Sequence, residues 1–225
     1  MNPENITSKI DDISFTINDT FKGKQIFVSS SFQTQSIPLL HIISRIDRNI
    51  PVYFINTGYH FPETLIFREH IANQLGLNII DLQSTVPKSH QRNEKGNLLY
   101  TSDPDYCCHI NKVQPLEPIL MTHDIWISGV RADQNSNRKN FKSIQEGPFD
   151  VSRYHPMLNW SGEDIKSYID SHDLPRHPLE GEGYTSMGCM PCTRKANSES
   201  LDEREGRWMG LTKTECGLHT EWTGK

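Results

Sequence analysis

The sequence lacks both a long hydrophobic run and an excess of positive charge, and these absences exclude several classes of protein. No window of the 225 residues approaches the roughly 20 apolar residues that a membrane-spanning helix needs. The start of the sequence has neither the basic nor the apolar region of a secretory signal. The formal net charge of −5 argues against a basic face that binds nucleic acid. We therefore expect a cytoplasmic protein that binds neither membranes nor nucleic acid.

Several common catalytic signatures are also missing. The sequence contains no Gly-rich dinucleotide fingerprint, no Walker A motif and no Ser/His/Asp signature. Its ten histidines form no HxxxH or HxH pair at metal-ligand spacing. The residues left to carry chemistry are the cysteines and the basic side chains.

Cysteine is scarce, and the five cysteines are unevenly placed. Four form the close pairs Cys107–Cys108 and Cys189–Cys192, and an odd total fits poorly with a secreted disulfide framework. Adjacent side chains diverge by about 100° on a helix, which favours a bulky iron–sulfur cluster over one zinc ion. Zinc and buried free thiols remain alternatives. The fifth, Cys216, lies near Lys213 and His219 and is interpreted as a reactive thiol or an incidental surface cysteine.

The hydrophobic pattern predicts alternating strands and helices. Short apolar runs at 25–28, 51–55, 77–82 and 125–128 have the length of buried strands. Helical spacing follows the first run, Pro62 is expected to begin a second helix that ends at Gly76, and Ser161 with Asp164 caps a third. We therefore predict an α/β fold with a mostly parallel sheet and flanking helices. We divide the chain into an N-terminal arm (1–20), an α/β domain (21–187) and a cysteine-containing C-terminal segment (188–225).

Ligands of such sheets bind beyond the carboxyl ends of the strands. The predicted loops at this edge contain Ser29, Ser30, Ser31 and Phe32 after the first strand, Thr57 and Gly58 after the second, and Arg131 after the fourth. A hydroxyl-rich loop at a helix N-terminus favours an anion, although an ordinary serine-rich turn is the alternative. Guanidinium and ammonium groups that can hold an anionic ligand are those of Lys112, Arg131, Arg138, Arg194, Arg204 and Arg207.

Several spaced motifs resemble a known family, the assimilatory adenylyl-sulfate reductases. They are Cys107-Cys108 followed by Lys112, the segment 128–134 (SGVRADQ), Gly188-Cys189-x-Pro191-Cys192, Gly206-Arg207-Trp208 and the segment 213–219 (KTECGLH). The resemblance implies an adenine nucleotide α-hydrolase-like fold related to the ATP pyrophosphatases. It also implies a [4Fe-4S] cluster on Cys107, Cys108, Cys189 and Cys192. Reductases of the 3′-phosphorylated substrate share the terminal cysteine but lack these four.

The resemblance further implies a mechanism. The Cys216 thiolate would attack the sulfur of adenylyl sulfate, AMP would leave, and a second thiol, expected from thioredoxin, would release sulfite from the S-sulfocysteine. Lys112, Arg204, Arg207 and His219 are the other expected catalytic residues. Ser29 to Phe32, Thr57, Gly58, Arg131, Arg138 and Arg194 are expected to bind substrate. A mobile C-terminal tail would present Cys216 first to substrate and then to its reductant, and the sequence leaves homo-oligomer formation open.

Two positions depart from the family pattern. Gln33 stands where members commonly have glycine, and Ala132 stands where they often have a second arginine. These differences leave open a reductase of 3′-phosphoadenylyl sulfate, or of both nucleotides. A zinc-stabilised nucleotide-binding module for sulfur transfer is a third reading of the same residues.

Overall fold

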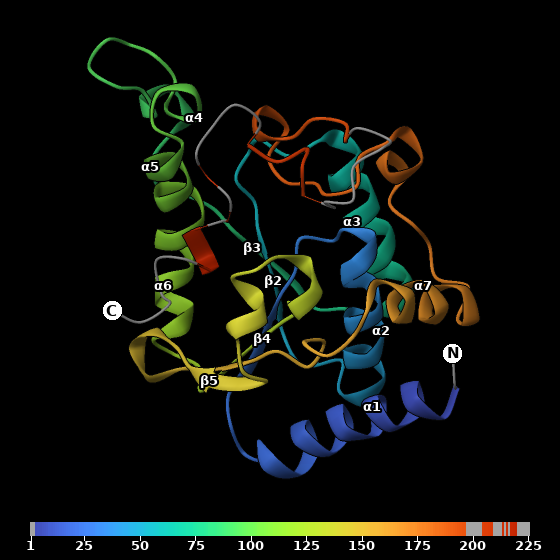
Figure 1. Cartoon of the computed structure of the whole chain (residues 1–225). Helices are drawn as coiled ribbons and strands as arrows, with labels where there is room; N and C mark the ends of the chain where they lie inside the picture. The colour runs from blue at the N-terminus through green and yellow to red at the C-terminus, as the bar shows by residue number, and fades with distance from the viewer. Residues whose placement is uncertain (1–2, 197–203, 209–212, 214, 216, 220–225) are drawn as a thin grey trace.

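The computed structural model describes residues 3–196, 204–208, 213, 215 and 217–219. In this part of the chain a six-stranded sheet has the order β3-β2-β1-β4-β6-β5 (Figure 1). All neighbouring strands are parallel except β5 and β6, which are antiparallel. The strands are β1 (Ile26–Ser29), β2 (Val52–Ile55), β3 (Ile79–Leu82), β4 (Ile125–Ser128), β5 (Ile144–Glu146) and β6 (Ser152–Tyr154). The sequence prediction of a mostly parallel sheet is confirmed, and so are its four strands.

Helices alternate with the strands along the chain. The α-helices are α1 (Pro3–Phe15), α2 (Ile37–Ile46), α3 (Pro62–Leu75), α4 (Leu99–Ser102), α5 (Pro104–Cys108), α6 (Gln114–Leu120) and α7 (Gly162–Ser171). Two π-helical segments, Thr16–Thr20 and His109–Val113, continue α1 and join α5 to α6. Short 3-10 segments are Thr34–Ser36, Lys88–His90, Ala132–Gln134, Arg138–Asn140, Pro148–Asp150, Pro178–Glu182, Met190–Cys192 and Gly217–His219.

Helices cover both faces of the sheet, as the alternation of strands and helices predicts. In β1, Phe27 and Val28 are both 0% exposed, yet they pack on opposite faces because successive strand residues alternate. Val28 belongs to the larger core, formed with α1, α2, α3 and α7, whereas Phe27 packs with Trp126 and the leucines of α6. Figure 1 shows α4, α5 and α6 on one side of the sheet and α1, α2, α3 and α7 on the other.

The helix boundaries follow local signals in the sequence. Pro62 begins α3, and Gly76 ends it with a left-handed backbone (φ 63°). At the start of α7, the Ser161 hydroxyl accepts from the Asp164 amide at 3.1 Å and the Asp164 carboxylate accepts from the Ser161 amide at 2.8 Å. The sequence left residues 1–20 between a short helix and a loose arm. Residues 3–20 form α1 and its π-helical continuation, whose Ile13 and Ile17 enter the main core.

In the ranges that the structure describes, every helix is too short or too polar to cross a lipid bilayer.

Candidate functional site

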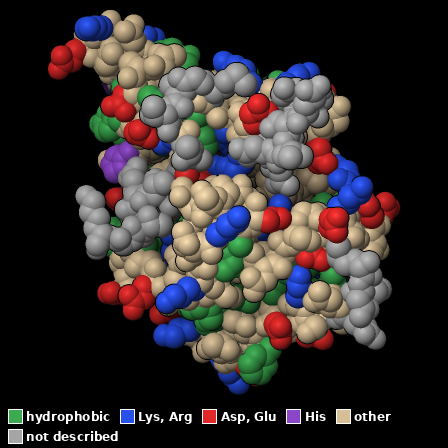
Figure 2. All heavy atoms as spheres, in the orientation of Figure 1, with side chains coloured by type: hydrophobic (Ala, Val, Ile, Leu, Met, Phe, Trp, Pro, Cys, Tyr) green, Lys and Arg blue, Asp and Glu red, His purple; other side chains and the backbone are tan. Residues whose placement is uncertain are grey.

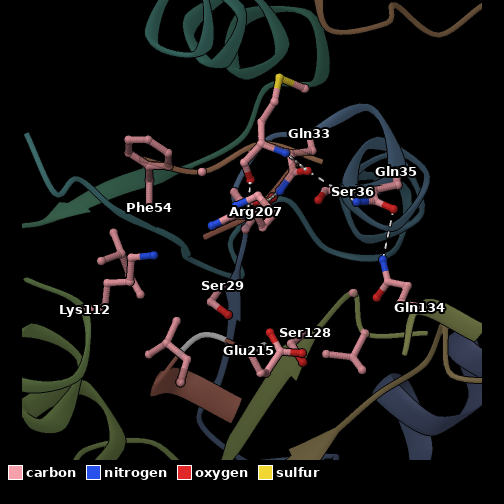
Figure 3. Close-up of a pocket in the computed structure, with 18 of the residues that line it drawn as sticks. Ser29, Gln33, Gln35, Ser36, Phe54, Lys112, Ser128, Gln134, Arg207 and Glu215 are labelled. Carbon is pink, nitrogen blue, oxygen red and sulfur yellow. Dashed lines mark hydrogen bonds between the residues drawn. The ribbon is translucent and has the colours of Figure 1, made fainter. Parts of the chain in front are cut away.

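A cavity of about 180 Å³ lies at the carboxyl ends of β1, β2 and β4. We call it the strand-end pocket. The loop between β1 and α2 lines one side, and residues from the C-terminal segments line another. Figure 3 shows Lys112, Arg207 and Glu215 approaching the same space from three parts of the chain. Figure 2 shows basic side chains at a hollow in this face of the molecule. The position agrees with the crevice predicted for a parallel sheet.

The loop after β1 supplies hydroxyl and amide groups to this pocket. Ser29, Ser30 and Ser31 line it, whereas Phe32 is fully buried beneath the loop with φ 54° and packs edge-on against Phe54. The Phe32 amide donates to the Ser30 hydroxyl at 3.1 Å, which stabilises the turn. The left-handed residue of this loop is therefore a phenylalanine.

Gln33 has an extended backbone (φ −73°), so this position does not require glycine. Its side-chain oxygen accepts from the Met187 amide at 2.8 Å, a bond drawn in Figure 3. This bond ties the loop after β1 to the segment that leads into Cys189. The Gln33 side chain thus joins two walls of the pocket.

Four basic side chains line the pocket: Lys112, Arg138, Arg204 and Arg207. Arg207 donates to the Met187 carbonyl oxygen at 2.8 Å and packs over the Trp208 ring at 4.4 Å. Its guanidinium also lies against Gly188, where a Cβ atom would collide with it. Backbone contacts therefore hold this cation in place at the pocket wall.

Glu215 is a buried carboxylate in the same pocket, and it pairs with two of these cations. Arg138 donates to it through Nε at 2.8 Å and through a terminal nitrogen at 3.1 Å, and Arg204 donates at 2.7 Å. In the sequence, Glu215 places a negative charge next to Cys216, and such a charge opposes ionisation of a thiol. The two guanidinium groups offset that negative charge.

Besides Phe32, four residues expected to bind substrate do not line the strand-end pocket. Arg131 is buried against Asp133 (2.9 Å) and Gln35 (3.1 Å), and Arg194 is exposed and donates to the Thr193 carbonyl oxygen at 2.9 Å. Gly58 is exposed. Thr57 is buried, and its hydroxyl lies 3.2 Å from the Cys189 sulfur. The loop after β2 therefore turns toward the cysteines.

The four paired cysteines surround a second, smaller pocket, which we call the cysteine pocket. Cys107 and Cys108 come from the end of α5, Cys189 precedes a 3-10 turn, and Cys192 is the last residue of that turn. The pocket is also lined by Tyr59, Tyr100, Pro104, Asn111, Lys112, Pro191, Arg207 and Trp208. Burial, together with the neighbouring Cys189 and Cys192, raises the pKa of the Cys107 thiol to about 11. Burial also raises the pKa of Cys192.

No group of three or more His, Cys, Asp or Glu side chains in the described part of the chain is arranged to hold a metal ion. The two pockets are nevertheless adjacent. Lys112, Cys189 and Arg207 line both of them, so these three side chains form a common wall.

Sequence reasoning missed several polar residues of the strand-end pocket. The side-chain oxygen of Gln35 accepts a hydrogen bond from the side-chain amide of Gln134 at 3.0 Å, which Figure 3 draws. The two residues are 99 positions apart in the sequence. Ser128 lies 2.9 Å from Nδ1 of the buried His155. Ser128 and Gln134 stand within the motif 128–134, which could have indicated them, but no local pattern indicates Gln35 or His155.

Cys216 and the side chain of His219 lie outside the described residues. Their neighbours Glu215 and Leu218 are described, and both line the strand-end pocket. Leu218 also packs on the cluster that contains Phe27 and Tyr53.

Comparisons with known proteins agree with this geometry. Residues 25–195 match the family model described as phosphoadenosine phosphosulfate reductase domain. The chain is 36% identical over 223 residues to the adenosine 5′-phosphosulfate reductase of Bacillus cereus, covering 92% of this chain and 95% of that protein. It is 38% identical over 205 residues to the protein of the same name from Streptomyces coelicolor, with coverages of 89% and 84%.

Solved structures extend the likeness at lower identity. Phosphoadenylyl-sulfate reductase from Candida auris is 19% identical with a TM-score of 0.65, covering 84% of this chain and 96% of that one. FMN adenylyltransferase from Candida glabrata is 18% identical with a TM-score of 0.62, covering 95% and 78%. These structural neighbours confirm the adenine nucleotide α-hydrolase-like fold. Because the family model spans most of the sequence and relatives match over nearly their whole length, the chain belongs to the phosphoadenosine phosphosulfate reductase family.

Proposed function

We propose that the protein reduces adenylyl sulfate to sulfite and AMP. The observation that carries this proposal is the strand-end pocket, where a hydroxyl-rich loop faces four basic side chains and Glu215, the residue before Cys216. Such a pocket fits a nucleotide whose sulfated end is anionic. The relatives from Bacillus and Streptomyces, both named adenosine 5′-phosphosulfate reductase, support this substrate.

The reaction proceeds in two thiol steps. The Cys216 thiolate attacks the sulfur atom, an S–S bond forms, the bond from sulfur to the phosphate oxygen breaks, and AMP leaves with that electron pair. A second thiolate then attacks the Cys216 sulfur, and sulfite leaves with the electrons of the S–S bond. The two thiols end as a disulfide, so the sulfate group gains two electrons. A dithiol protein of the thioredoxin type supplies the second thiol and reduces the disulfide.

The basic residues stabilise the charge that accumulates during the first step. An anionic thiolate approaches an anionic sulfate group, and nearby fixed cations reduce that repulsion. Lys112 and Arg207 stand on the wall shared by both pockets, and Arg204 faces Glu215. We assign Lys112, Arg204 and Arg207 to the sulfate group and the serines of the β1–α2 loop to the nucleotide.

The donor set of the cysteine pocket fits an iron–sulfur cluster held by Cys107, Cys108, Cys189 and Cys192. Four thiols line one pocket together with apolar rings, and burial raises the pKa of Cys107 and Cys192. Buried thiols become thiolates when iron compensates their charge. When bound, a [4Fe-4S] cluster would supply a fixed charge next to Lys112 and the substrate. The adjacent pair Cys107–Cys108 suits a bulky cluster better than one zinc ion.

The test is sulfite release by protein purified without oxygen and supplied with thioredoxin. Adenylyl sulfate and its 3′-phosphorylated form are compared, and iron, labile sulfide and zinc are measured on the same sample. We expect preference for adenylyl sulfate, brown protein, and loss of sulfite release in Cys216→Ser without loss of iron. Release at the wild-type rate by Cys216→Ser would contradict the mechanism. Colourless, zinc-containing protein without sulfite release would favour the sulfur-transfer module instead.

A further inference from the structure

Glu215 is a buried carboxylate that lines the strand-end pocket. It is 3% exposed, and its two oxygens accept hydrogen bonds from Arg138, Arg204 and Asn135. The hydrogen bond that the side-chain amide of Asn135 donates to Glu215 is 2.8 Å long. A carboxylate so far from water stays ionised in the fold only when cations and donors replace its hydration shell.

These partners come from a distant part of the chain. Arg138 and Asn135 lie in the loop after β4, and about 80 positions separate them from Glu215. The loop is itself ordered, since the Arg138 amide donates to the Asn135 side chain at 2.9 Å and a terminal nitrogen of Arg138 donates to Gln134. Glu215 thus attaches the end of the chain to a fixed part of the α/β domain.

A second contact lies on the other side of Cys216 in the sequence. Leu218 packs against the cluster of Phe27, Tyr53 and Trp126. Glu215 and Leu218 are therefore each held against the α/β domain, Glu215 by a buried ion pair and Leu218 by an apolar contact.

We infer that Glu215 is a positioning residue, which docks the segment carrying Cys216 onto the strand-end pocket through Arg138 and Asn135. The inference rests on the proposed role of Cys216 as nucleophile. The carboxylate contributes by holding the main chain, whereas the basic residues contact substrate. Because Arg204 pairs with Glu215 and also faces the pocket, docking of the segment sets the position of one substrate-binding cation as well.

The test compares Glu215→Gln with Glu215→Asp and with the matched control Glu182→Gln, which removes a carboxylate from the exposed pair with Lys195 (3.8 Å). Alkylation of Cys216 by iodoacetamide is followed by peptide mass spectrometry, and single-turnover sulfite release is measured on the same samples. For Glu215→Gln we expect Cys216 alkylation to rise and sulfite release to fall, each by roughly tenfold, with AMP affinity within about twofold. Glu215→Asp should recover part of both effects, and Glu182→Gln should resemble the wild type.

Dependence on Arg138 is tested by adding Arg138→Gln to Glu215→Gln. If the two residues act through one ion pair, the double variant should be no worse than the poorer single variant. Additive losses, or wild-type alkylation and turnover in Glu215→Gln, would overturn the inference. If Glu215→Gln does not fold, Asn135→Ala removes a single donor and should give the same changes at smaller size. Wild-type protein without sulfite release would refute the proposed function, whereas the alkylation comparison would still decide whether Glu215 docks the segment.

Discussion

The two sides of the strand-end pocket differ in charge. The loop between β1 and α2 contributes serine and glutamine side chains, without a charged residue between Ser29 and Ser36. The other segments that line the pocket, which we call its charged side, contribute Lys112, Arg138, Arg204 and Arg207. Neutral donors suit the uncharged parts of a nucleotide, and fixed cations suit a group whose charge changes during reaction. The difference indicates that binding and chemistry are divided between the two sides, which substitutions on each side can test.

The largest effect is expected on the charged side. Lys112→Ala should lower single-turnover sulfite release by roughly 100-fold, because an ammonium beside the sulfate group is lost. Binding of AMP, which lacks that group, should change little, and iron content should remain. Lys24→Ala is the matched control, since Lys24 lies in an exposed pair with Asp124. Unchanged turnover in Lys112→Ala would show that Lys112 does not stabilise the sulfate group during the reaction.

Acid should destabilise the region beneath the charged side. Burial and the neighbouring Arg153 and Arg138 lower the pKa of His155 from 6.5 to about 3. Below pH 6.5 the unfolded chain therefore binds the proton more readily, so the free energy of unfolding falls as the pH falls toward 3. We expect His155 to account for a loss of about 2 kcal/mol between pH 7 and pH 5.

Urea unfolding at both pH values measures this loss. His155→Gln should show a shallower pH dependence than the wild type, whereas the exposed control His70→Gln should keep the wild-type slope. Equal slopes in all three proteins would show that His155 is not responsible.

A methyl group at Gly188 should displace Arg207 on the charged side of the pocket and leave the β1–α2 loop unchanged. In Gly188→Ala the new Cβ would meet the Arg207 guanidinium, so this flexible side chain must move away from the wall. We expect turnover to fall roughly tenfold with the AMP affinity retained. Gly181→Ala is the control, because a Cβ there meets no atom within 4 Å. The idea fails if the two alanine variants have equal turnover.

The smallest effect is expected on the neutral side. Gln33→Ala removes the hydrogen bond to the Met187 amide, and a bond of this kind contributes about 1 kcal/mol. We expect the KM for adenylyl sulfate to rise roughly fivefold with kcat nearly unchanged. Loss of kcat instead of KM would show that the neutral side also takes part in chemistry.

Sequence reasoning predicted the parts of the fold that local patterns specify. Strands β1 to β4, the end of α3 at Gly76 and the capping box at Ser161 follow from hydrophobic period and backbone preference. It missed β5 and β6, which have three residues each and alternate too briefly to give a period. Local signals therefore predicted the framework on which the pocket is built.

Within the pocket, the sequence could not predict the contacts between residues that are distant along the chain. The position of Arg131 in its motif indicates a ligand contact, but its guanidinium pairs with Asp133 and Gln35 instead. The enclosure of Glu215 by Arg138 is equally invisible in the sequence, because each residue alone resembles a solvated surface charge. Whether such a charged residue contacts a ligand or another side chain depends on which residues the fold brings together. Hydrophobic periodicity does not predict these pairings.

The central place of β1 has a consequence for stability. This strand joins the half of the sheet that contains β2 and β3 to the half that contains β4, β5 and β6. A ligand at the carboxyl end of β1 would touch loops from both halves of the sheet. Such a ligand binds the folded protein and not the unfolded chain, because only folding brings these loops together. Nucleotide should therefore delay unfolding of the whole sheet as one unit, with a melting temperature that rises with ligand concentration.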